Sequence, residues 1–216
     1  MATTRPKPTL VLLVRHGQTP TTGTVLPGRA PGLHLSEAGH GQAEAVAERI
    51  GVLGDRVTGV YSSPLERTRE TAAPIARAVG RRVRARAELA DCDPGEWTGR
   101  RLSALRRRRE WRTVQERPSG FRFPRGESFG EMQLRATTAV ETIRRDHPGS
   151  TVVVVSHADP IASVVTDAFG LHLDLFQRVT ISPCSVTSIL YSEGAPRVLT
   201  VNGTGHELAA MAPTAR

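Results

Sequence analysis

The sequence is poor in cysteine, lysine and aromatic residues, and it contains no long apolar run. Its two cysteines, Cys92 and Cys184, are too few for a disulfide framework and fit a reducing compartment, so we expect a cytoplasmic protein. No segment approaches the ~20 apolar residues that cross a bilayer, and no charged leader precedes an apolar stretch. We therefore expect neither membrane insertion nor secretion.

The length of the chain bounds its domain organisation. With 216 residues, it can bury one sizeable core without needing a second. The first nine residues carry two prolines and little apolar content, and the segment beyond His206 is rich in alanine and proline. We expect a single domain over residues 1–216, with a core at about 10–207 and flexible tails over 1–9 and beyond 206.

The basic residues are almost all arginine. Lys7 is the only lysine among 29 basic residues, and the formal net charge is +8. Arginine binds phosphate through a planar pair of donors, which suits an anionic substrate, although genome composition accounts for most of the excess. The run Arg106–Arg109 would fan around a helical turn without interleaved aromatic residues, so we expect a solvated face and no nucleic-acid partner.

Apolar patterning alternates between strands and helices along the chain. The run 10–14 is apolar at every position, which is typical of a strand buried on both faces. Strands are predicted at 10–14, 57–61, 82–87, 151–155, 185–191 and 196–201, and helices at 36–50, 64–79, 102–115, 128–146 and 158–169. This order predicts an α/β fold, a three-layer α/β/α sandwich whose mostly parallel sheet has an antiparallel edge.

Polar groups follow three of the buried strands at the point where each strand ends. Arg15 and His16 follow the first strand, Arg67 comes shortly after the second, and His157 follows the fourth. Open α/β sheets bind ligands at the carboxyl ends of their strands, so we expect these side chains to meet at one site.

Five segments appear in an order that resembles the histidine phosphatase superfamily. They are Leu-Val-Arg-His-Gly-Gln-Thr at 13–19, Tyr-Ser-Ser-Pro-Leu-Glu-Arg-Thr at 61–68, Gly-Glu-Trp-Thr-Gly at 95–99, Gly-Glu-Ser at 126–128 and Val-Ser-His at 155–157. Within the superfamily, the chain resembles an actinobacterial phosphomutase/phosphatase branch. The resemblance implies the phosphoglycerate mutase-like fold and transfer of a phosphoryl group through a phosphohistidine.

The resemblance also implies roles for individual residues. His16 would be the nucleophile, with a neutral ring whose second nitrogen is held by a backbone carbonyl. Arg15, Arg67 and His157 would surround the charge of the phosphoryl group. The expected substrate-binding residues are Gly17, Gln18, Thr19, Thr22, Gly28 and Ala158. Relatives often have asparagine at the place of Thr22 and glycine at the place of Ala158.

The proton donor departs from the family pattern. Relatives usually carry glutamate where this chain has Asp91, in the run Leu89–Gly95. An aspartate needs a raised pKa to act as an acid near neutrality. We predict that Asp91 is the general acid, with Asp93, Glu88 and Glu96 as the alternatives.

No metal ion or other cofactor is expected. The histidines outside the motifs are scattered without ligand-like spacing: His34, His40, His147, His172 and His206. Cys92 lacks a phosphate-binding cysteine loop and is predicted to be a small packing residue.

We expect hydrolysis of a small phosphomonoester by a monomer or homodimer. The alternatives are a phosphoglycerate mutase-type phosphomutase and a non-catalytic protein that binds phosphorylated metabolites. The segment between Gly99 and Gly126 is short, which favours access of water and therefore hydrolysis. One or two of Arg100, Arg101 and Arg112 could overhang the site and hold a second anion of the substrate.

Overall fold

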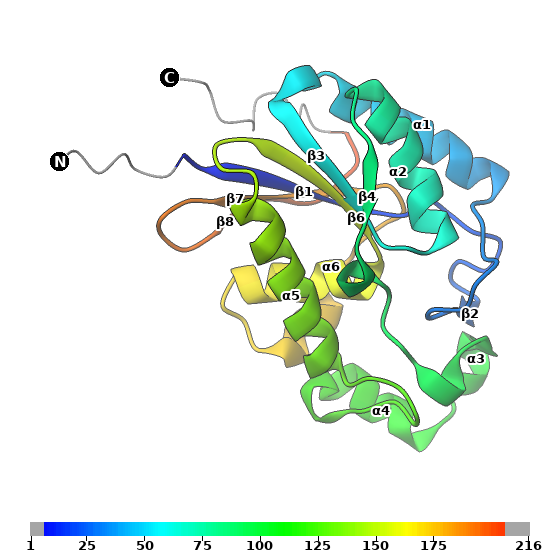
Figure 1. Cartoon of the computed structure of the whole chain (residues 1–216). Helices are drawn as coiled ribbons and strands as arrows, with labels where there is room; N and C mark the ends of the chain where they lie inside the picture. Colours follow the sequence, from blue (N-terminus) through cyan, green and yellow to red (C-terminus); the bar gives the residue numbers. More distant parts are fainter. Residues whose placement is uncertain (1–6, 206–216) are drawn as a thin grey trace.

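The computed structural model describes residues 7–205, which build a six-stranded sheet with helices on both faces (Figure 1). The strand order is β4-β3-β6-β1-β7-β8. The first four strands in that order are parallel, and β7 and β8 run antiparallel to their neighbours. The strands are β1 (Thr9–Arg15), β3 (Val57–Ser62), β4 (Val83–Ala85), β6 (Thr151–Ser156), β7 (Val186–Tyr191) and β8 (Arg197–Gly203). The predicted fold class is therefore confirmed.

The apolar side chains of β1 alternate between two separate cores. Val11 and Leu13 belong to the cluster on one face of the sheet, whereas Leu10, Leu12 and Val14 belong to the cluster on the other. Successive side chains of a strand point to opposite faces, so a strand that is apolar throughout needs cover on both sides. This requirement explains the three layers.

Four long helices provide that cover. α1 (Glu37–Gly51) and α2 (Glu66–Ala78) lie on one side of the sheet, and α5 (Phe129–Arg145) and α6 (Ala158–Ala168) lie on the other (Figure 1). Ser36, where the predicted helix over 36–50 begins, caps α1 by accepting a hydrogen bond from the Gly39 amide. Ser128 caps α5 in a capping box with Glu131.

The predicted helix over 102–115 is wrong, because it is two helices, α3 (Leu102–Leu105) and α4 (Arg109–Glu116). Arg108 has an extended backbone (φ −77°, ψ 143°) and its guanidinium lies 5.3 Å from the ring centroid of Trp97. The cation–π contact ties the break between the two helices to the aromatic core. Consequently, Arg106–Arg109 does not form one helical surface.

Several shorter elements differ from the prediction. β2 (Val25–Leu26) and β5 (Arg100–Arg101) pair as a small second sheet that the sequence did not indicate. The strand predicted over 82–87 shortens to β4 because a 3-10 turn begins at Ala87. The 3-10 turns are Gly54–Arg56, Ala87–Leu89, Gly95–Trp97, Pro118–Gly120 and Leu173–Arg178.

The predicted tails lie mostly outside the described residues. Residues 1–6 and 206–216 belong to that part of the chain. Thr9, predicted to lie in the first tail, instead begins β1 and is buried, and its hydroxyl donates a hydrogen bond to the His147 carbonyl at 2.9 Å. Over residues 7–205, no helix has the length and apolar character needed to cross a membrane.

Candidate active site

The register of the central strands brings three sequence motifs to one edge of the sheet. Arg15 at the end of β1 pairs with Ser156 at the end of β6, and Ser62 of β3 pairs with Val155. The residues that follow these strands therefore start from adjacent positions. The rings of His16 and His157 lie with their centroids 5.2 Å apart and their planes inclined by 61°.

His16 is held as a neutral imidazole. Its Nδ1–H donates to the carbonyl oxygen of Gly17 at 2.7 Å, because a carbonyl can only accept, and this fixes the tautomer. Burial, with the nearby charges of Arg67 and Arg15, lowers the pKa of His16 to about 3. No described residue hydrogen-bonds to Nε2, which therefore keeps its lone pair for attack on an electrophile.

His157 is the second buried imidazole. Its Nε2 lies 2.9 Å from the hydroxyl of Ser63, and its Nδ1 lies 3.6 Å from Oδ2 of Asp91 without a hydrogen-bond partner in the described chain. Burial, together with the charge of Arg67, lowers the pKa of His157 well below its usual range. An approaching anion would oppose that shift and favour the protonated ring.

Arg15 and Arg67 place buried N–H groups beside the two rings. Arg67 is fully buried at the second position of α2, where Nη2 donates to the Gly28 carbonyl at 2.8 Å and to Oδ2 of Asp91 at 3.1 Å. Arg15 Nη1 donates to the Ile181 carbonyl at 2.6 Å. Nε of Arg15 and both Nε and Nη1 of Arg67 are buried without a partner among residues 7–205.

Asp91 contacts the guanidinium group of Arg67 and lies near that of Arg15. Its Oδ1 accepts a hydrogen bond from the Cys92 amide at 3.0 Å, and its side chain is 17% exposed. Burial raises the pKa of Asp91 in spite of the Arg67 charge. Its backbone carbonyl accepts hydrogen bonds from Arg29 and Arg135, both at 2.9 Å, so the segment that carries it is anchored.

The three alternative acids have other surroundings. Glu88 is exposed in a 3-10 turn. Asp93 accepts a hydrogen bond from the Gly95 amide at 2.9 Å, which makes it part of the turn before Gly95. Glu96 is exposed and forms an ion pair with Arg125 at 3.3 Å. Of the four carboxylates, Asp91 is the one that contacts Arg67 and His157.

A cavity of about 260 Å³ opens beside these groups. Arg15, His16 and Asp91 line it, together with the predicted substrate-binding residues Thr19, Thr22, Gly28 and Ala158. Thr22 Oγ1 accepts a hydrogen bond from the Thr19 amide at 2.9 Å and lies 3.0 Å from the Thr19 hydroxyl, so the two side chains brace one loop.

Four of the predicted site residues do not line this cavity: Gly17, Gln18, Arg67 and His157. A Cβ on Gly17 would lie 2.6 Å from the Gly39 carbonyl oxygen, so glycine is needed there for the close approach of α1. The predicted substrate-binding residue Gly17 therefore makes its close approach to a helix. Gln18 is exposed, and its backbone N–H donates a hydrogen bond to Oε1 of Gln42 at 2.9 Å.

Asp159 is a lining residue that the sequence analysis did not identify. It lies two positions after His157, in the first turn of α6. Burial and the nearby charge of Asp91 together raise the pKa of Asp159 to about 7. The signal was available, because a carboxylate in the first turn of a helix that starts at a strand end must lie near the site.

The remaining histidines and cysteines lie outside this chemistry. Within residues 7–205, no group of three or more His, Cys, Asp or Glu side chains is placed to hold a metal ion. His206 lies beyond the described residues. Cys92 lines the cavity but is largely buried, and burial raises the pKa of its thiol, which disfavours the thiolate.

Comparison with known proteins gives a family and several relatives. A model of the histidine phosphatase superfamily (branch 1) matches residues 11–204. The uncharacterized protein Rv0525 of Mycobacterium tuberculosis (strain ATCC 25618 / H37Rv) is 37% identical over 199 residues, covering 86% of this chain and 92% of Rv0525. Phosphoserine phosphatase 1 of Hydrogenobacter thermophilus is 30% identical over 201 residues, covering 91% of this chain and 93% of that enzyme.

A solved structure has the same fold. The mycobacterial glucosyl-3-phosphoglycerate phosphatase Rv2419c superimposes with a TM-score of 0.82, over 92% of this chain and all of the other. The two sequences are 23% identical. This likeness concerns the arrangement of the backbone.

Proposed function

The chain belongs to the histidine phosphatase superfamily, and we propose that it hydrolyses small phosphomonoesters through a phosphohistidine at His16, without a metal ion. One observation carries the proposal. Buried nitrogen atoms of Arg15, Arg67 and His157 lack hydrogen-bond partners in the described chain, and these three side chains lie near a neutral His16. Buried donors are normally paired, so these groups fit a bound anion such as a phosphoryl group.

In the first step, Nε2 of His16 attacks phosphorus and the bond between phosphorus and the alcohol oxygen breaks. The low pKa of the ring keeps the lone pair free at neutral pH. The transferring group retains its charge on three equatorial oxygens, and the two guanidinium groups and His157 supply donors for them.

Asp91 is the proposed proton donor for the leaving alcohol. Its raised pKa favours the protonated form that an acid needs. After donation, the carboxylate takes a proton from the water that attacks phospho-His16. The phosphorus–nitrogen bond then breaks, its electron pair returns to Nε2, and phosphate leaves.

We also propose that the whole chain forms one domain, acts in the cytoplasm as a monomer or homodimer, and binds neither membrane nor nucleic acid. Both core clusters pack on one sheet, which supports a single domain. The two cysteines are free and buried, in accord with a reducing compartment. The break within Arg106–Arg109 divides the most basic segment.

The decisive test is to trap the phosphoenzyme. Rapid quench with a labelled phosphomonoester should give an acid-labile, base-stable phosphoprotein in the native enzyme and none in His16→Ala. His34→Ala is the matched control, because His34 is exposed and pairs with Glu70 away from the cavity. EDTA should leave turnover unchanged.

Three other outcomes would each overturn a different part of the proposal. Full turnover by His16→Ala would remove the phosphohistidine. Conversion of labelled 3-phosphoglycerate into an isomer, in place of released phosphate, would identify a phosphomutase. Binding of phosphorylated metabolites without turnover would identify a non-catalytic binding protein.

A further inference from the structure

A second cavity of about 270 Å³ adjoins the one at His16. Five residues line both cavities: Leu26, Leu102, Phe123, Ala158 and Asp159. The two spaces therefore meet at Asp159 and Ala158, at the start of α6. We call the second space the apolar chamber. The apolar chamber therefore offers a place for the alcohol part of a phosphomonoester bound at His16.

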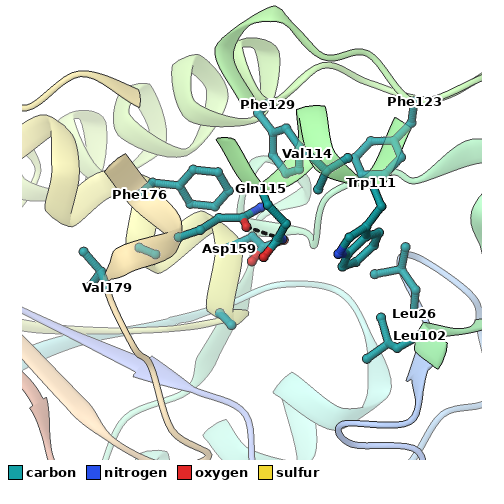
Figure 2. Close-up of a pocket in the computed structure, with 13 residues that line it drawn as sticks. Leu26, Leu102, Trp111, Val114, Gln115, Phe123, Phe129, Asp159, Phe176 and Val179 are labelled. Atoms are coloured by element: carbon teal, nitrogen blue, oxygen red, sulfur yellow. Dashed lines mark hydrogen bonds between the residues drawn. The ribbon is translucent and has the colours of Figure 1, made fainter. Parts of the chain in front are cut away.

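The wall of the apolar chamber is mainly aromatic and aliphatic. Trp111 and Val114 come from α4, Phe129 from α5 and Phe176 from the 3-10 turn Leu173–Arg178 (Figure 2). Gln115 and Gln177 close one side with a hydrogen bond between their side chains. Moving an apolar group from water into contact with this wall is favourable. Moving a polar group there is unfavourable, because the wall has few partners for its hydrogen bonds.

Asp159 is the only charged residue among the described residues that line the apolar chamber. Its carboxylate makes no hydrogen bond or ion pair within residues 7–205. Arg15 and Asp91 are the charges that act on it, from the side of the phosphoryl site. An anionic alcohol part would meet a carboxylate here and no cation.

The arginines that could have served a second anion lie elsewhere. Arg100, Arg101 and Arg112 line neither cavity. Arg100 Nε donates to the Glu96 carbonyl at 2.9 Å, and Arg112 pairs with Glu116 one turn along α4. Both guanidinium groups therefore have partners of their own.

We propose that the substrates are phosphomonoesters of uncharged, apolar alcohols, with the alcohol part in the apolar chamber and Asp159 rejecting alcohols that carry a negative charge. This inference rests on the proposed phosphatase function and names the substrate class of that site. Placing like charges side by side is an effective way to exclude wrong partners.

Straight-chain alkyl phosphates test the chamber because their leaving alcohols have similar reactivity. Each buried methylene contributes ~0.8 kcal/mol, which corresponds to about fourfold in kcat/KM. Hexyl phosphate should therefore exceed ethyl phosphate by at least roughly tenfold. Trp111→Ala should lower this hexyl-to-ethyl ratio, whereas Arg112→Ala, which alters the next residue on α4 outside the chamber, should leave the ratio unchanged.

A second pair of substrates tests the charge rule. Butyl phosphate should be preferred over 4-phosphooxybutanoate by about tenfold or more when the assay pH is well above 7, where the Asp159 carboxylate is ionised. Asp159→Asn should lower this ratio of butyl phosphate to 4-phosphooxybutanoate hydrolysis by about tenfold. Because each variant is judged by a ratio of two substrates, a partial loss of folded protein does not change the result.

The outcomes separate this inference from the function on which it rests. If no alkyl phosphate is hydrolysed in a His16-dependent manner, the proposed phosphatase function fails. If hydrolysis occurs but the hexyl-to-ethyl ratio is near one, or Trp111→Ala leaves it unchanged, the chamber does not bind the alcohol part. If 4-phosphooxybutanoate is preferred, or if Asp159→Asn leaves the butyl preference unchanged, the charge rule is wrong.

Discussion

Replacing Arg67 with alanine is expected to lower kcat/KM by about 10²–10⁴-fold. Arg67 is fully buried and keeps two donors, Nε and Nη1, without partners among residues 7–205. A hydrogen bond to a charged group contributes roughly 1.5–3 kcal/mol, so two bonds to the phosphoryl oxygens contribute about 3–6 kcal/mol. One factor of ten in rate corresponds to about 1.36 kcal/mol, which gives the stated range.

Arg67→Lys separates charge from geometry. Lysine keeps the positive charge but cannot present two coplanar donors, so we expect it to recover only part of the loss. Arg69→Ala is the matched control, because Arg69 lies two residues further along α2 and is exposed.

The assay is steady-state hydrolysis of hexyl phosphate, with thermal unfolding of each variant measured in parallel. The Tm identifies protein that fails to fold after losing the contacts of Arg67 with Gly28 and Asp91. A folded Arg67→Ala enzyme with kcat/KM within threefold of Arg69→Ala would refute the assignment of the unpartnered donors to the phosphoryl group.

Two further predictions concern protons. The pKa of His16 falls from 6.5 to about 3 on folding. Between these pH values the unfolded chain binds a proton at His16 and the folded chain does not. The free energy of unfolding should therefore fall by up to about 5 kcal/mol as the pH is lowered from 6.5 to 3. Urea titrations should show a shallower pH dependence for His16→Gln, and equal slopes would contradict the low pKa. Asp91→Asn should lose about 10²–10⁴-fold in kcat/KM with alkyl phosphates and much less with p-nitrophenyl phosphate, whose leaving group needs little protonation. If Asp93→Asn or Asp159→Asn shows that selective loss instead, the acid role belongs to that residue.

The sheet could be predicted from the sequence because a strand that is buried on both faces has apolar residues at every position. Five apolar residues in a row from Leu10 to Val14 leave no polar face for solvent, and the structure divides them between two cores. The caps of α1 and α5 could be predicted for a similar reason, since Ser36 and Ser128 act within their own turns. Such features depend on neighbours in the chain.

The features that could not be predicted depend on contacts between distant segments. The break between α3 and α4 coincides with the contact of Arg108 with Trp97, which periodicity does not record. β2 and β5 pair across about 75 residues of chain, with two residues in each strand, which is too short for an alternating pattern. The apolar chamber belongs to the same class, because its walls come from α4, α5 and the 3-10 turn that follows α6.

The carboxyl group of Asp91 and the imidazole of His157 explain how protons can be in the right place when a substrate arrives. Asp91 lies 3.1 Å from Arg67 and 3.6 Å from His157 Nδ1, and burial raises its pKa. A bound phosphate monoester adds up to two negative charges, which favour the protonated forms of Asp91 and His157 beside it. Binding is therefore expected to raise the pKa of Asp91 and of His157 together. The acid is then protonated when a leaving alcohol needs it, and His157 becomes a charged donor while phosphate is present. His16 starts from a pKa of about 3, which burial and the charges of Arg67 and Arg15 hold low, so its Nε2 keeps the lone pair that attacks phosphorus.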